Sequence, residues 1–261
     1  MEQRYGLAPS GSISDSPLMA HPPLTALHGF TEDDTVWQEA LAPLGLSLRC
    51  PLLPGHGWKP CPADTTFAGL AAELAATLPA GGDLLGYSLG GRLALQIALD
   101  HPRHVRRLVL VSCTAGIRVE AERAARVHSD EHLAEVLSED GIGPFVAWWQ
   151  ANPALRPAKP LSRAEEEALR SRRLNQDPRG LAMALRRLGA GAMADLWPRL
   201  GELRLPVLLI AGAADTRYVA TMRAMAGLIP GARLELVPDA GHAVHREQAE
   251  RVRTLVGAFF S

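Results

Sequence analysis

The sequence predicts an α/β protein with a mostly parallel central sheet, helices on both faces and an inserted helical lid. Short apolar runs alternate with helical patterns along most of the 261 residues, which is typical of a parallel sheet covered on both faces. One apolar run ends in Gly-Tyr-Ser-Leu-Gly at residues 86–90, and a helical pattern follows at once. The alternation stops between residues 115 and 196, where no strand-like run occurs.

Six apolar runs are predicted strands, and turn residues follow each of them. They occupy residues 24–27, 46–50, 83–86, 105–111, 207–211 and 233–237. Helical patterns cover residues 67–78, 91–100, 217–229 and 248–260. Because parallel strands need long crossover connections, this alternation predicts strands that run in one direction.

The region from 115 to 196 has the pattern of several helices rich in Arg, Glu and Ala, inserted between the fourth and fifth predicted strands. Ligands of open α/β sheets bind at the carboxyl ends of the strands, so we predict a lid over that edge. The chain would then consist of a first part of the core (1–114), the lid (115–196) and a second part of the core (197–261). The alternative is an added helical bundle of structural value only. Residues 1–22 have the pattern of a loose lead-in.

The composition is ordinary for a globular enzyme, with 47% hydrophobic and 21% charged residues and a formal net charge of −1. Such a charge gives no global field that would recruit nucleic acid or an anionic membrane. No apolar stretch approaches the roughly 20 residues of a membrane span. Residues 1–20 are polar and lack a basic region followed by an apolar run, so we expect no secretory signal there. The cysteines Cys50, Cys61 and Cys113 form no C-x-x-C pair, which favours a reduced compartment. We expect a cytoplasmic protein that binds neither nucleic acid nor membrane; the oligomeric state stays open.

Ser88 stands at the centre of the Gly-x-Ser-x-Gly motif, between a predicted strand and a predicted helix. In that context the motif forms a sharp, strained turn whose flanking glycines avoid a clash of side chains. It therefore predicts the α/β-hydrolase fold, with Ser88 as the reactive serine at a helix N-terminus that favours negative charge.

Asp215 and His242 are the predicted partners of the serine. In this fold the chain order is Ser, then Asp or Glu, then His, and the two residues follow the fifth and sixth predicted strands. Asp215 would also suit a helix N-cap. Asp239 is a rival carboxylate, but it lies three residues before His242 in the same turn. His245 is a rival base that we expect in the first turn of the last helix.

An oxyanion hole needs two backbone N–H groups, and Leu89, the residue after the serine, would supply one. Phe30 would supply the other, because it follows the first predicted strand. His28 and His56 in the neighbouring turns are expected to be structural. No His, Cys or Asp cluster has metal-ligand spacing and no Gly-rich loop resembles a nucleotide cradle, so we expect no metal and no cofactor.

Several motifs together resemble the menaquinone-pathway 2-succinyl-6-hydroxy-2,4-cyclohexadiene-1-carboxylate synthases over residues 24–258. The motifs lie at residues 27–30, 53–57, 86–92 and 240–245, and in the lid at 122–126, 148–149, 172–175 and 188–191. The resemblance implies a lyase on a hydrolase scaffold that eliminates pyruvate from 2-succinyl-5-enolpyruvyl-6-hydroxy-3-cyclohexene-1-carboxylate. Ser88, activated by His242 and Asp215, would act as general base, and the Phe30 and Leu89 N–H groups would hold the developing enolate.

The same resemblance implies a pocket for a small anionic polycarboxylate, lined by Tyr87, Arg92, Arg126, Trp149 and Arg173. Carboxylates leave water only when cations and hydrogen bonds replace their hydration, so arginines make physical sense there. Arg92 lies one turn into the helix after Ser88 and can face the pocket. The lid match also allows Arg123 in place of Arg126.

Three other functions fit parts of this pattern. A carboxylesterase or thioesterase would use the same triad through an acyl-enzyme, and a carbon–carbon bond hydrolase would act on ring-cleavage products. A non-catalytic relative that binds a small anion is the third alternative. A complete triad argues against the last, and convergent arginines favour an anionic substrate over a simple ester.

Overall fold

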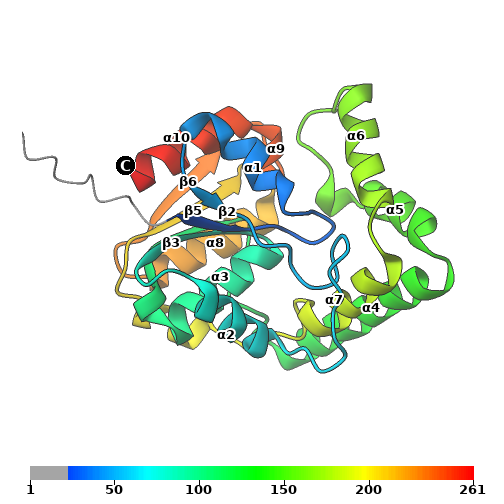
Figure 1. Ribbon diagram of the computed structural model, residues 1–261, viewed down its shortest axis with the longest axis horizontal. Helices are drawn as coiled ribbons and strands as arrows, with labels where there is room; N and C mark the ends of the chain where they lie inside the picture. Colours follow the sequence, from blue (N-terminus) through cyan, green and yellow to red (C-terminus); the bar gives the residue numbers. More distant parts are fainter. Residues whose placement is uncertain (1–22) are drawn as a thin grey trace, which may run out of the picture.

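The computed structural model describes residues 23–261, so the expected lead-in at 1–22 lies outside the described residues. Its sheet has six strands in the order β2-β1-β3-β4-β5-β6, and every pairing is parallel (Figure 1). The strands are β1 (Leu24–Leu27), β2 (Leu48–Arg49), β3 (Gly82–Tyr87), β4 (Val105–Val111), β5 (Val207–Gly212) and β6 (Arg233–Val237). The predicted α/β fold is thus confirmed. The second strand is shorter than the predicted 46–50, because only two residues of this edge strand pair with β1.

Helices cover both faces of the sheet. One face packs against α1 (Thr35–Leu41) and α10 (Ala249–Phe260); the other packs against α2 (Phe67–Thr77), α3 (Leu89–Asp100) and α8 (Thr216–Leu228) (Figure 1). Side chains of a strand alternate between the faces, so Leu84 and Leu85 enter different apolar clusters. This burial on both sides explains why the inner strands β1 and β5 are nearly continuous apolar runs, whereas the edge strands β2 and β6 are only partly buried.

Four helices lie between β4 and β5 and project to one side of the sheet (Figure 1). They are α4 (Glu120–Glu139), α5 (Ile142–Ala151), α6 (Arg163–Leu174) and α7 (Pro178–Leu188). A capping box of Ser162 and Glu165 begins α6, and the Asp177 carboxylate caps the first N–H groups of α7. The helices share an apolar cluster of their own, which includes Leu133, Phe145 and Leu181.

Short elements complete the described chain: η1 (Ala42–Leu44), η2 (Pro102–His104), η3 (Pro153–Leu155), η4 (Trp197–Glu202) and α9 (Val244–Glu247). None of the helices in residues 23–261 combines the length and the apolar character that a bilayer crossing requires.

Candidate active site

Ser88 occupies the sharp turn between β3 and α3. Its φ of 51° and ψ of −107° are strained for a residue with a side chain. Such a conformation persists only where the surrounding packing holds it in place. A Cβ atom on Gly86 would collide with the backbone of Gly90, and one on Gly90 would collide with the carbonyl groups of Leu27 and His28. The glycines therefore permit the close packing of strand and helix that exposes the serine.

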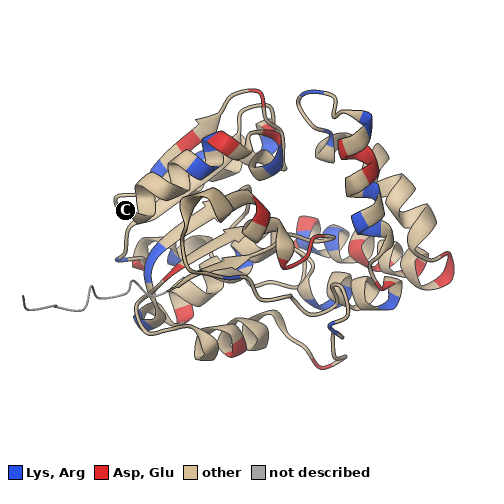
Figure 2. Ribbon diagram, turned by 45° about the horizontal axis from the view of Figure 1, so that its top comes forward, with Lys and Arg blue, Asp and Glu red and all other residues tan. Residues whose placement is uncertain are grey.

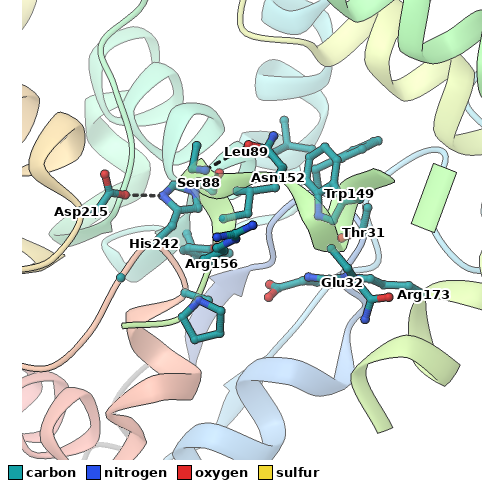
Figure 3. A pocket seen from close by; sticks show the side chains of 18 of the residues that line it. Thr31, Glu32, Ser88, Leu89, Trp149, Asn152, Arg156, Arg173, Asp215 and His242 are labelled. Atoms are coloured by element: carbon teal, nitrogen blue, oxygen red, sulfur yellow. Dashed lines mark hydrogen bonds and ion pairs between the residues drawn. The ribbon is translucent and has the colours of Figure 1, made fainter. Parts of the chain in front are cut away.

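Asp215 and His242 lie beside this serine, although they come from distant parts of the chain. His242 Nε2 is 3.2 Å from Ser88 Oγ, and His242 Nδ1 is 2.9 Å from Asp215 Oδ2 (Figure 3). The parallel sheet causes this meeting, because the three residues follow the carboxyl ends of β3, β5 and β6. The arrangement supplies a nucleophile or base, a proton acceptor and an orienting carboxylate in hydrogen-bond contact.

The Asp215 carboxylate has two roles in the structure. Its Oδ1 accepts a hydrogen bond of 3.1 Å from the Tyr218 N–H and so caps α8, while Oδ2 contacts His242. The capping role and the orienting role, which the sequence offered as alternatives, are therefore compatible. The rival Asp239 instead pairs with Lys159 at 2.9 Å on the surface.

The rings of Tyr87 and Tyr218 flank the His242 imidazole, with centroid distances of 5.4 and 4.5 Å. His242 is 6% exposed, so its ring has little freedom to turn.

His28 has the structural role expected of it. Its Nε2 accepts a hydrogen bond from the Leu53 N–H at 3.0 Å, and its Nδ1 lies 2.8 Å from the Gly29 carbonyl oxygen.

Phe30 and Leu89 both line the same cavity as Ser88 and His242. Among residues 23–261, neither backbone N–H group makes a hydrogen bond. Leu89 is the first residue of α3, where an N–H group has no partner within the helix. Two free donors beside a serine at a helix N-terminus can stabilise an oxygen that gains negative charge.

The cavity has a volume of about 1030 Å³, and the lid forms much of its wall. Arg92 and Arg173 line it, and no carboxylate of the described chain pairs with either one. Arg92 is 8% exposed; its guanidinium lies over the Phe67 ring at 5.4 Å and 3.9 Å from Met193 Sδ. Burial lowers the pKa of Arg92 and of Arg173 to about 10, so both remain cations at neutral pH. A buried cation (Arg92) and a half-buried one (Arg173), neither paired with a carboxylate, fit an anionic ligand.

The other predicted pocket residues reach the cavity in different ways. Arg126 lines it but donates to Asp130 at 2.8 Å, so part of its charge is neutralised. Arg123 pairs with Glu120 at 2.7 Å and does not line the cavity. Trp149 stacks on Phe145 at 5.4 Å, and Tyr87 is buried beneath the site. Basic and acidic residues are interspersed over the lid helices rather than segregated (Figure 2).

Several lining residues were absent from the sequence prediction. Glu32, Asn152, Arg156, Tyr218 and Arg246 all border the cavity (Figure 3 shows the first three). Two of them had a usable signal, because Tyr218 stands one helical turn after Asp215, and Arg246 stands one turn after His242. Asn152 and Arg156 lie in an irregular connection of the lid, where no sequence periodicity indicates direction.

His245 lies elsewhere than expected. It belongs to the separate short helix α9, not to the first turn of α10, and it is 1% exposed. Its Nε2 is 3.0 Å from Glu32 Oε1 and its ring packs on Tyr87, so it does not face Ser88. Within residues 23–261, no group of three His, Cys, Asp or Glu side chains has the geometry of a metal site.

The parallel sheet, the strained serine turn and the contact of Ser88 with His242 and Asp215 are the features of a serine-centred α/β hydrolase. Residues 26–255 match the alpha/beta hydrolase family, which defines the class of the protein.

Relatives narrow this class further. The chain is 33% identical, over 96% of its length and 94% of the relative's, to a Bacillus subtilis (strain 168) protein named for 2-succinyl-6-hydroxy-2,4-cyclohexadiene-1-carboxylate synthase. It superposes on the structure of MenH from S. aureus with a TM-score of 0.88, at 32% identity and covering 94% and 95% of the two chains. It is also 32% identical, over 91% of its length and 98% of the relative's, to a pimeloyl-[acyl-carrier protein] methyl ester esterase of Aromatoleum aromaticum. The chain belongs to the 2-succinyl-6-hydroxy-2,4-cyclohexadiene-1-carboxylate synthase family of the alpha/beta hydrolases, and the resemblance found in the sequence is confirmed.

Proposed function

We propose that this protein is a lyase that eliminates pyruvate from 2-succinyl-5-enolpyruvyl-6-hydroxy-3-cyclohexene-1-carboxylate in menaquinone biosynthesis. The observation that carries the proposal is the Ser88–His242–Asp215 contact beneath a cavity that holds the unpaired cations Arg92 and Arg173. The names of the synthase relatives support the same reaction.

In this reaction Ser88, with its proton passing to His242, removes the proton alpha to the succinyl ketone. The electron pair moves through the ring, the carbon–oxygen bond to the enolpyruvyl group breaks, and enolpyruvate leaves and takes up a proton to become pyruvate. Asp215 stabilises the imidazolium, and the N–H groups of Phe30 and Leu89 stabilise the enolate oxygen. No water is consumed and no acyl-enzyme forms.

Substrate carboxylates would contact Arg92, Arg126 and Arg173, with Tyr87 and Trp149 as further walls. Each arginine offers a planar donor pair that matches a carboxylate. We place the catalytic core in residues 1–114 and 197–261 and a substrate-binding lid in 115–196. A cytoplasmic location stays a prediction.

A coupled assay for pyruvate tests the proposal. Wild-type protein should release pyruvate from the enolpyruvyl substrate much faster than it hydrolyses an aryl acetate. Ser88→Ala should reduce pyruvate release by a factor on the order of 10⁴ or more, because the residue that takes the proton is gone while the binding arginines remain.

The control substrate is a methyl monoester of a dicarboxylic acid, chosen because a methyl ester esterase is among the relatives. Rapid hydrolysis of this ester without pyruvate release from the enolpyruvyl substrate would replace the lyase proposal by an esterase. The folded state of Ser88→Ala is verified by its melting temperature, which should match that of the wild type.

A further inference from the structure

Glu32 is a buried carboxylate beside the cavity that the reaction proposed above does not use. It is 5% exposed and connects two segments. Its Oε2 accepts a hydrogen bond of 3.0 Å from the Gly29 N–H, in the turn after β1. Its Oε1 lies 3.0 Å from both His245 Nε2 and the Arg246 guanidinium, on α9. A carboxylate this well paired in the interior serves a structural or positioning purpose.

The turn that Glu32 closes contains Phe30. The Glu32 N–H donates to the Gly29 carbonyl at 3.3 Å while the Glu32 side chain accepts from the Gly29 N–H, so the two residues bond each other in both directions. The N–H of Phe30 between them is left free for a ligand. The direction of that N–H therefore depends on the conformation of residues 29–32.

This turn is strained and needs external support. Thr31 has a φ of 64°, a left-handed conformation that a β-branched residue rarely adopts and that costs on the order of 1–3 kcal/mol. The Tyr87 ring packs so closely on Gly29 that no Cβ atom would fit there, and this contact restricts the conformation of the turn. The Phe30 ring packs on Trp149 at a centroid distance of 5.3 Å, which restricts it from the lid side.

The contacts of the Glu32 carboxylate with α9 keep it ionised. Burial alone would raise the pKa of Glu32, but the charge of Arg246 and the contact with His245 outweigh it and lower the pKa far below its usual range. Both partners follow His242 within four residues, so the carboxylate also fixes the segment that carries the base.

We propose that Glu32 is a positioning residue that holds the strained turn at residues 29–32 and thereby aims the Phe30 N–H at the oxygen that becomes negative. The proposal rests on the oxyanion role given to Phe30 under the proposed function. Loss of one oxyanion-hole donor lowers kcat by about 10²–10³-fold in other enzymes, which sets the expected scale.

Glu32→Ala and Glu32→Gln test the proposal. The alanine variant should lose about 100-fold in kcat with KM changed less than about threefold, because the N–H acts in the transition state. The glutamine variant keeps an acceptor for the Gly29 N–H and should lose about tenfold or less. Asp34→Ala is the matched control: it removes a carboxylate two residues away that does not line the cavity, and its kcat should stay within about twofold of wild type.

A second substitution separates positioning from general destabilisation. Glycine adopts a left-handed φ without strain, so Thr31→Gly should restore about tenfold of the kcat lost in Glu32→Ala. If the alanine variant does not fold, the same rescue is measured in Glu32→Gln. Equal losses in the Ala and Gln variants, a loss confined to KM, or no rescue by Thr31→Gly would overturn the proposal.

The rate at which a fluorophosphonate probe labels Ser88 gives a readout that does not depend on the natural substrate, since its phosphoryl oxygen also becomes negative during attack. Glu32→Ala should slow this labelling about as much as it slows turnover. If the wild type releases no pyruvate but labelling still falls in Glu32→Ala, the lyase proposal fails and the positioning role stands. Unchanged labelling in a folded Glu32→Ala protein would reject the positioning role alone.

Discussion

At the scale of single residues, Arg92 shows most clearly that the pocket is built for a charge that the protein itself does not supply. Its guanidinium is almost fully buried, yet its contacts are the Phe67 ring and the Met193 sulfur. Desolvation of an unpaired cation destabilises the folded protein, and a bound carboxylate would offset that loss.

Arg92→Met should therefore shift activity and stability in opposite directions. A carboxylate contact is worth a few kcal/mol, so kcat/KM for the enolpyruvyl substrate should fall about 100-fold. The melting temperature should stay the same or rise, because an apolar side chain replaces a buried charge. Steady-state kinetics and calorimetry of the same preparation measure both effects.

Arg123→Met is the control, because Arg123 forms an exposed pair with Glu120 outside the cavity. The kcat/KM and the melting temperature of this variant should both remain close to those of the wild type. If Arg92→Met lowered the melting temperature but left turnover normal, Arg92 would stabilise the fold and would not bind the substrate.

At the scale of elements, the short helix α9 links the base to the lid. Glu247, its last residue, accepts hydrogen bonds through Oε2 from the Gly241 N–H at 2.8 Å and from the Ala158 N–H at 2.7 Å. Gly241 immediately precedes His242, and Ala158 lies in the lid between η3 and α6. Lys159 pairs with Asp239 at 2.9 Å beside this link. The lid is therefore bonded directly to the turn that carries the base.

Glu247→Ala should lower kcat about tenfold, because the N–H groups of Gly241 and Ala158 lose their acceptor and the His242 turn gains freedom. Proteolysis should also cut the segment at residues 153–162 faster, since one of its attachments is gone. Glu247→Gln keeps an acceptor oxygen and should behave nearly as the wild type.

The exposed Glu250 of α10 offers a control carboxylate, and its replacement by Ala should change neither measurement. Normal turnover together with faster proteolysis in Glu247→Ala would limit this link to a structural role.

The elements also show what the sequence could and could not predict. The strands at 24–27, 105–111 and 233–237 agree with their predicted bounds, because turn residues flank each apolar or alternating run and limit its length. The helix at 35–41 was not predicted, since its seven residues are too short for a clear period. The individual lid helices were not delimited either; α4 and α5 carry weak apolar patterns, whereas the amphipathic pattern of α7 and its Asp-Pro start at residues 177–178 were usable signals.

Some residues of the candidate site could be predicted from the sequence, and others could not. The neighbourhood of Ser88, Asp215 and His242 follows from rules of chain order and strand ends, so the sequence was sufficient to predict it. Glu32 was missed because its basic partners, His245 and Arg246, lie more than two hundred residues away, and nothing local indicates that a carboxylate in a loop is buried.

At the scale of the whole molecule, Asp83 anchors the end of the sheet opposite the active site. Its carboxylate accepts hydrogen bonds from Arg106 and Arg107 at 2.7 Å each, and Arg107 also donates to the carbonyl groups of Phe259 and Phe260 at the end of α10. The interaction joins β3, β4 and the last helix. Burial would raise the pKa of Asp83, but the hydrogen bonds from Arg107 and Arg106 outweigh it and lower the pKa.

Asp83→Asn should lower the free energy of unfolding at pH 7 by about 1–3 kcal/mol and leave kcat/KM unchanged. A carboxylate whose pKa is lower in the folded protein binds fewer protons there than in the unfolded chain. Its stabilisation is therefore complete above the unfolded pKa of about 4 and disappears as the pH falls through the folded pKa. Urea titrations at several pH values should show the difference from wild type shrinking below about pH 4.

The exposed Asp64 serves as the control, and Asp64→Asn should change stability little at any pH. The difference in the free energy of unfolding between Asp83→Asn and wild type could instead stay the same in strong acid. That result would show that the shape of the side chain, not its charge, stabilises the protein at this position.

The lid helices carry an apolar cluster of their own, separate from the two clusters that sandwich the sheet. Phe30 of the core also packs against this cluster, and Ala184 and Leu188 of α7 belong to one of the clusters that sandwich the sheet. Replacements inside the lid cluster should therefore change the shape of the chamber above the serine and also reach the turn that carries Phe30. We expect sequence exchanges among these helices to alter which substrate is admitted and, through Phe30, how fast it reacts.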